Sequence, residues 1–157
     1  MKLLIALLLL STVTFGQTYV AFNPSFYTGQ GTVQQRTNLT LEAGRQWGPF
    51  STGIDLGKIN ISKQHRQDTT WYTEIRPNLN VFQQDKFTNT VTIGIGYIFG
   101  AEENVLTELA TGVEYTPNSR VSYNIFFGTY YFSGKYSSSS QNYFGLQVMY
   151  YLKTIKR

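Results

Sequence analysis

Apolar and polar residues alternate along most of the chain from Gln17 onward. In segments of about ten residues, every second side chain is apolar and the residues between them are small or polar. A period of two indicates a β-strand with one apolar face, whereas an amphipathic helix repeats about every 3.6 residues. The alternation predicts eight strands, at approximately 19–27, 37–47, 50–62, 70–82, 87–99, 105–115, 120–132 and 143–152.

The alternation changes phase once, inside the third predicted strand. Ile54 and Leu56 belong to one face, but Ile59 and Ile61 continue the apolar set one position late, after Gly57. A β-bulge inserts one extra residue into a strand and moves the following side chains to the other face. We therefore expect a bulge near Gly57.

The connections between the predicted strands fall into two sets. The first, third, fifth and seventh are mostly longer and cover 28–36, 63–69, 100–104 and 133–142. The second, fourth and sixth are tight, contain Gly, Pro or Asn, and cover 48–49, 83–86 and 116–119. Short periplasmic turns and longer external loops are typical of outer-membrane barrels. In such a barrel the odd connections would lie outside the cell, and eight strands would return the chain to the periplasm.

The period of two does not itself say which face points inward. A soluble barrel or sandwich would bury the apolar face, whereas an outer-membrane barrel turns it toward lipid. The polar face here is rich in Gly, Ala, Ser, Thr and Asn and carries few charges, unlike a typical solvated face. A narrow eight-stranded lumen needs such small residues. The pattern therefore favours a lipid-facing apolar side.

Aromatic residues at the ends of the apolar faces favour the same orientation, because amphipathic rings prefer the membrane–water interface. One predicted girdle contains Trp47, Phe50, Phe87, Tyr115 and Tyr150. The other contains Phe26, Trp71, Phe99, Tyr131 and Phe144. Strands of about 11 residues, at roughly 3.3 Å per residue and tilted about 40°, rise on the order of 28 Å, close to the hydrocarbon thickness of a bilayer.

The beginning of the chain predicts export. Met1 and Lys2 form a positive start, residues 3–10 are apolar, and 14–16 fit the small-x-small cleavage rule. We expect a cleaved signal peptide over 1–16, a barrel over 17–152 and a short periplasmic tail over 153–157. The apolar run is much shorter than the about 20 residues of a transmembrane helix.

Composition excludes several other classes. Charged residues make up 14% of the chain, against about 25% in an average soluble domain. Aromatic residues make up 16%, which excludes intrinsic disorder. The absence of cysteine excludes a disulfide scaffold and a thiolate metal site. A net charge of +4 without any run of Lys or Arg gives no reason to expect a nucleic-acid partner. We predict no cofactor and no metal site.

The last predicted strand, 143–152, has the sequence YFGLQVMYYL. On this strand and on the overall pattern, the chain resembles the small eight-stranded outer-membrane barrels of the OmpX type and the membrane domain of OmpA-like proteins. A glycine followed by alternating apolar and aromatic residues is similar to the C-terminal assembly signal of that family. The family usually ends on an aromatic residue, whereas here 153–157 follow. The resemblance implies an antiparallel up-and-down transmembrane barrel that contacts outer-membrane lipids and, during insertion, the barrel-assembly machinery.

The predicted inward face carries a group of charged residues. The predicted lumen network consists of Glu42, Asp55, Glu74, Arg76, Glu108 and Glu114. Buried charges must be paired or neutralised, and eight strands enclose side chains rather than an aqueous channel. We therefore expect a network that plugs the lumen, with the excess acids protonated or paired with Arg45 or Lys58. An ion path or a proton-linked site is the alternative.

Candidate catalytic chemistry is sparse. His65, the only histidine, lies in the second predicted external connection near Ser62. Some outer-membrane barrels are lipid A acyltransferases or deacylases that use His with Ser and a carboxylate. The deacylases place His and Ser two residues apart on one strand face, but position 67 is Gln. The G-x-G at Gly94 fails the dinucleotide fingerprint, because position 99 is Phe and no helix follows.

The sequence thus predicts an outer-membrane barrel with a structural or interaction role, no enzymatic activity, and short external loops. Residues 137–140 are expected to form a flexible loop tip, for which adhesive or ligand-binding use is an alternative. Three other functions stay open. A narrow transport or ligand-binding barrel would need a water path past Arg76 and Glu74. A secreted soluble barrel would turn its Leu, Ile and Phe residues inward around an apolar ligand. A lipid-modifying enzyme would place His65 beside a serine and a carboxylate.

Overall fold

The protein folds into eight β-strands that the alternation largely predicts. The computed structural model describes residues 16–27, 37–62, 67–101, 104–135 and 138–152. The strands are β1 (Gln17–Tyr27), β2 (Thr37–Trp47), β3 (Phe50–Ser62), β4 (Gln67–Gln84), β5 (Phe87–Ile98), β6 (Val105–Tyr115), β7 (Val121–Ser133) and β8 (Ser138–Tyr151). The predicted signal peptide, apart from Gly16, the predicted tail and His65 lie outside the described residues.

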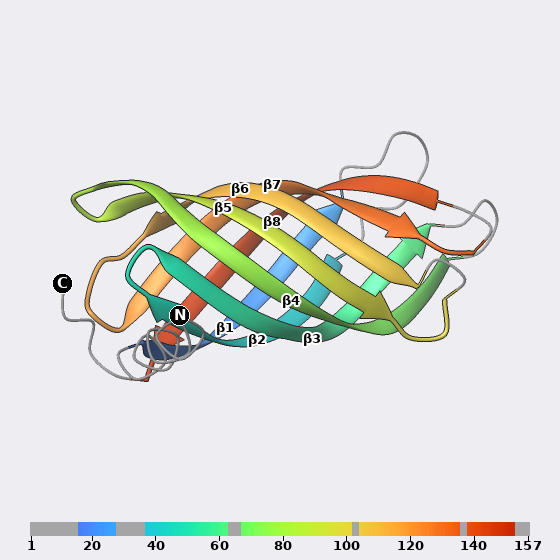
Figure 1. Ribbon diagram of the computed structural model, residues 1–157, viewed down its shortest axis with the longest axis horizontal. Coiled ribbons are helices and arrows are strands. Elements are labelled where there is room, and N and C mark those ends of the chain that lie inside the picture. The colour runs from blue at the N-terminus through green and yellow to red at the C-terminus, as the bar shows by residue number, and fades with distance from the viewer. Residues whose placement is uncertain (1–15, 28–36, 63–66, 102–103, 136–137, 153–157) are drawn as a thin grey trace, which may run out of the picture.

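The eight strands form one closed barrel. Each strand pairs antiparallel with the next along the chain, and β1 pairs with β8. Figure 1 shows the strands running steeply across the barrel wall. The predicted fold class, an all-β antiparallel up-and-down barrel of eight strands, is confirmed. None of the described residues belongs to a helix that is long and apolar enough to cross a membrane.

The register of the ladder sets the tilt of the strands. A path through the paired residues leaves β8 at Tyr150, enters β1 at Val20, crosses every strand and returns to β8 at Ser140. One circuit therefore shifts the path by 150 − 140 = 10 residues along β8. With about 3.3 Å per residue and about 4.8 Å between eight strands, this shift tilts the strands by about 40° from the barrel axis.

The apolar face of the sheet points outward. Ile93, Ile95 and Leu109 are 53%, 64% and 52% exposed, whereas Glu74 and Glu114 on the opposite face are 1% and 6% exposed. The predicted orientation is confirmed. The alternative of a soluble barrel holding an apolar ligand required the Leu, Ile and Phe set to meet inside, and the structure contradicts it.

The predicted bulge near Gly57 is wrong. β3 pairs with β4 in one unbroken register from Phe50 to Ser62. Ile59 is fully buried inside the barrel, while Lys58 points outward. The alternation changes phase here because the lumen itself becomes apolar at this end: Ile59 belongs to a buried cluster with Tyr72. An inward apolar residue was mistaken for a displaced outward one.

A register shift does occur, but in β4, between Asn80 and Phe82. An extra residue at this point leaves both Val81 and Phe82 exposed, at 61% and 59%. A β-bulge explains two consecutive apolar residues on the outside of a strand that otherwise alternates.

Three strands are longer than predicted: β1 begins at Gln17 instead of 19, and β4 and β8 differ more. β4 covers Gln67–Gln84 instead of 70–82, and β8 begins at Ser138 instead of 143. Ser138, Ser139 and Ser140 were expected in a loop tip, but they pair with the end of β7. Serine has a low strand propensity, which a neighbouring strand readily overrides. The third and seventh connections are therefore shorter than expected, at 63–66 and 134–137.

The connections nevertheless divide between the two ends of the barrel. The tight turns at 48–49, 85–86 and 116–120 lie at the end where β1 begins and β8 ends. The strand ends that flank the other connections lie at the opposite end (Figure 1). We call these the turn end and the loop end.

Candidate functional site

The lumen is packed in three layers. At the loop end lies an apolar and aromatic layer that includes Ile98, the last residue of β5, and Leu106, near the start of β6. At the turn end lies a smaller cluster of Tyr19, Ala21, Met149 and Tyr151. Between these layers lie the charged residues Glu42, Asp55, Glu74, Arg76 and Glu108.

Arg76 on β4 is the centre of the charged layer and is 6% exposed. Its Nε lies 2.7 Å from Glu108 Oε2, and its Nη2 lies 3.0 Å from Glu108 Oε1. Its Nη1 lies 3.3 Å from Glu42 Oε2 and 3.4 Å from Asp55 Oδ2. The planar guanidinium thus serves three carboxylates from three other strands, a geometry that lysine does not provide.

Neutral donors complete the shell of Glu42. The hydroxyl of Tyr19 donates to Glu42 Oε1 at 2.5 Å. The side-chain amides of Asn23 and Gln147 both donate to Glu42 Oε2, each at 2.8 Å. Tyr143 donates its hydroxyl hydrogen to Glu108. Charge-assisted hydrogen bonds of this kind are the strong ones inside a protein, so the network ties opposite walls of the barrel together.

Glu74 is the exception within this layer. It is 1% exposed, and neither of its carboxylate oxygens has a hydrogen-bond partner in the described part of the chain. Its cross-strand neighbour Asp55 also has one unpartnered oxygen, Oδ1. A carboxylate in this position gains little from its charge, because the one guanidinium already serves three other acids.

Glycines on the inward face make room for the acids. A Cβ added to Gly94 would collide with Glu74 Oε1, and a Cβ added to Gly53 would collide with Glu42 Oε1. A Cβ added to Gly145 would collide with the ring of Phe126. The centre of this ring lies 5.4 Å from the Arg76 guanidinium carbon. The small residues of the polar face therefore leave room that the long side chains of neighbouring strands occupy.

The remaining charged residues of the prediction lie elsewhere. Glu114 is buried near the turn end, where it accepts a hydrogen bond from Thr116 at 2.9 Å. The excess acids were expected to be protonated or paired with Arg45 or Lys58. The ion pairs of Glu42, Asp55 and Glu108 are with Arg76, and protonation of the other acids stays a prediction. Arg45 and Lys58 lie beside tryptophan rings instead, Arg45 at 6.0 Å from Trp47 and Lys58 at 5.2 Å from Trp71. Lys58 is exposed on the outward face, where it cannot reach the lumen.

Most residues of the two predicted girdles lie near strand ends on the outward face. Trp47 stacks on Phe50 at 6.1 Å, and Phe87 lies 5.0 Å from Tyr115, both at the turn end. Trp47 is half-buried. The exposed members are Phe26, Phe50, Trp71, Phe87, Phe99, Tyr115, Tyr131, Phe144 and Tyr150. Phe144 differs from the others, because it lies in the middle of β8 and pairs with Phe127 of β7.

Sequence reasoning placed the acids and Arg76 inside but did not single out their neutral partners. Tyr19, Asn23, Tyr143 and Gln147 bind the acids directly. For Asn23 and Gln147, the signal was their place on the same alternating face as the acids. No group of His, Cys, Asp or Glu that could hold a metal ion occurs among the described residues.

The geometry defines the chain as a small closed barrel with an apolar outer wall and a packed lumen that is charged in its middle layer. Several solved structures share this fold, among them the following two. The solution NMR structure of the de novo designed TMB2.3 has a TM-score of 0.59 and 15% sequence identity, covering 88% of this chain and 95% of that one. The crystal structure of Neisserial surface protein A (NspA) has a TM-score of 0.57 and 11% identity, covering 86% of this chain and 94% of that one. At such identities the likeness shows the fold alone. No protein-family model and no curated protein matches the sequence.

Proposed function

We propose that this protein is an outer-membrane barrel of Gram-negative-type cells with a structural or interaction role. The observation that carries the proposal is the outer wall, on which large apolar residues such as Leu41, Ile95 and Ile54 are 66%, 64% and 59% exposed. Apolar burial is worth about 25 cal/mol per Å², so a wall of this kind is costly in water and favourable in lipid. A closed barrel also leaves no unpaired sheet edge along its wall, as a bilayer requires.

The positions of the aromatic side chains support an orientation of the barrel across the membrane. Aromatic pairs such as Trp47–Phe50 and Phe87–Tyr115 lie at the turn end, where interfacial rings would anchor the barrel. The turn end would face the periplasm and the loop end the exterior. This orientation agrees with the predicted signal peptide and with the resemblance to OmpX-type and OmpA-like barrels, which also implies insertion by the barrel-assembly machinery.

The packed charged layer of the lumen supports a structural role rather than transport. Arg76 connects Glu42, Asp55 and Glu108 across the interior. An ion or solute crossing this layer would have to displace buried, charge-assisted hydrogen bonds. External partners would then be bound by the loops and by the outer surface.

Cell fractionation combined with heat-modifiability on gels tests the proposal. The protein should be found with the outer membrane, resist SDS when unheated and change mobility on boiling. Purified protein should also insert into lipid vesicles and show no conductance steps in a planar bilayer. Recovery as an ordinary soluble periplasmic protein would overturn the membrane assignment, and regular conductance steps would overturn the closed lumen.

A further inference from the structure

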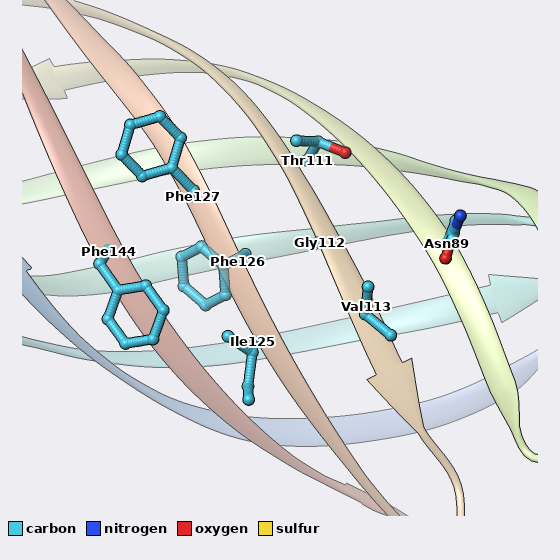
Figure 2. A pocket seen from close by; sticks show the side chains of 8 residues that line it. All are labelled: Asn89, Thr111, Gly112, Val113, Ile125, Phe126, Phe127 and Phe144. Carbon is cyan, nitrogen blue, oxygen red and sulfur yellow. The ribbon is translucent and has the colours of Figure 1, made fainter.

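The outer wall over β5, β6, β7 and β8 contains a depression of about 260 Å³. Figure 2 shows it from outside, with Phe127 and Phe144 on one side and Asn89 on the other. Its outward lining residues are Asn89, Thr111, Val113, Ile125, Phe127 and Phe144.

The register explains why the wall is hollow here. Asn89, Val113 and Ile125 lie on one rung of the ladder. Thr111, Phe127 and Phe144 lie on the next outward rung. Small side chains on β5 and β6 thus lie beside large ones on β7 and β8, and the difference in side-chain length leaves a hollow between them.

The two ends of the depression differ in polarity. Asn89 lies two residues from Phe87, at the turn-end rim, and its side-chain amide forms no hydrogen bond within the described part of the chain. The hydroxyl of Thr111 donates to the carbonyl of Thr90 at 3.1 Å and is therefore satisfied. The far end is closed by Phe127 and Phe144 and is apolar apart from the satisfied hydroxyl of Thr111. An amide without a partner on an apolar wall is unfavourable in lipid unless a ligand pairs with it.

Cations lie beyond the rim on the same side of the barrel. Lys86 immediately precedes Phe87, and its carbonyl accepts a hydrogen bond from the backbone N–H of Thr116, the residue after β6. Arg120 precedes β7 and lies 3.5 Å from the hydroxyl of Tyr150. Asp85 shares the turn with Lys86 and offsets part of its charge.

We propose that the depression binds one glycerophospholipid of the periplasmic leaflet. This inference rests on the proposed membrane location. From the rim toward the middle of the wall, the surface offers a cation at Lys86, an aromatic pair, an amide at Asn89 and an apolar hollow. A glycerophospholipid presents its groups in the complementary order: phosphate, interfacial region, glycerol ester and acyl chain. A second copy of the barrel is the competing occupant, and the dimer outcome named below tests it.

Native mass spectrometry of the full chain in detergent micelles, titrated with phosphatidylglycerol, tests the site. Val113→Phe fills the hollow and should weaken binding at least about tenfold, while the matched outward change Ala43→Phe on β2 should leave it within about twofold, tenfold being about 1.4 kcal/mol. Asn89→Leu should weaken binding of phosphatidylglycerol and of diacylglycerol alike, with Thr107→Leu on β6 as its control. Lys86→Gln should weaken binding of phosphatidylglycerol only.

The outcomes separate this inference from the proposed function. All variants change outward or turn side chains, so each should insert into vesicles and remain heat-modifiable. If they insert and Val113→Phe retains as much lipid as Ala43→Phe, the lipid site is wrong and the membrane barrel stands. An equal loss of lipid binding in Val113→Phe and Ala43→Phe also contradicts the site. So does a wild-type dimer that Val113→Phe abolishes without any change in lipid binding. If the wild-type chain does not insert at all, the proposed function itself fails.

Discussion

Arg76 and Glu108 meet through two parallel hydrogen bonds, Nε to Oε2 at 2.7 Å and Nη2 to Oε1 at 3.0 Å. The two residues come from β4 and β6, and Glu108 is fully buried. A bidentate pair fixes both the distance and the relative orientation of its partners. Because Arg76 also bonds Glu42 and Asp55, this one side chain holds the middle of the barrel together.

Replacing Arg76 by methionine should be strongly destabilising. Arg76→Met would leave three buried carboxylates without their cation, and breaking a buried ion pair from one side costs about 3–5 kcal/mol. Urea unfolding of the barrel in lipid vesicles measures the change. Arg120→Gln, at the exposed rim, is the control and should unfold like the wild type. Equal stabilities of the two variants would mean that the network does not hold the lumen.

Glu74 and Glu108 should respond differently to the same conservative change. Glu108→Gln breaks a bidentate pair and should cost about 1.5–3 kcal/mol, the range for hydrogen bonds to charged groups. Glu74→Gln removes a carboxylate whose two oxygens have no partner in the described chain. It should therefore change the unfolding free energy by less than about 1 kcal/mol. A larger loss from Glu74→Gln in the same unfolding experiment would contradict this assignment of roles.

The alternation of the sequence was sufficient to place the acids and Arg76 inside, because side-chain direction in a strand depends only on parity. It was not sufficient to say which of them meet. Glu42 and Gln147 are hydrogen-bonded although they are 105 residues apart. That contact depends on the ten-residue shift of the closed ladder, which no local pattern encodes.

The alternation also gave a wrong assignment where the lumen changes from polar to apolar along a strand. Ile59 was assigned to the outside because it is apolar, yet it is buried beneath the loop end with Tyr72 and Ile98. The assumption that the whole lumen is polar was at fault. Ser138 was missed for another reason, since its strand character comes from pairing with Ser133 and not from its own propensity.

Ile59 provides a direct test of this correction. Ile59→Ala removes a fully buried side chain from a packed cluster and should cost about 2–5 kcal/mol. Ile54→Ala, on the same strand but 59% exposed on the outer wall, should cost clearly less. Unfolding of both variants in one detergent measures the difference. The reverse order would restore the bulge that the alternation suggested.

Gly145 should tolerate no larger residue while Phe126 is present. A Cβ at this position collides with the Phe126 ring, which lies against Arg76. Gly145→Val should therefore cost about 1–3 kcal/mol through overpacking. A double-mutant cycle with Phe126→Ala separates this clash from the glycine's own backbone effect, because the valine should cost less once the ring is removed. Strictly additive losses would show that the two residues do not compete for the same space.

The last prediction concerns the outer wall. Ile93 lies near the middle of β5 on the outward face and pairs with Leu109. If the wall faces hydrocarbon, Ile93→Arg places a charge close to the bilayer midplane, which costs roughly 2–4 kcal/mol, whereas Val105→Arg, at the loop end, should cost only about 0–1 kcal/mol. Unfolding in lipid vesicles measures both, and the depth dependence is the informative quantity, because a general intolerance of arginine would lower both stabilities equally. Equal effects, or no effect of Ile93→Arg, would mean that water rather than lipid covers this part of the barrel.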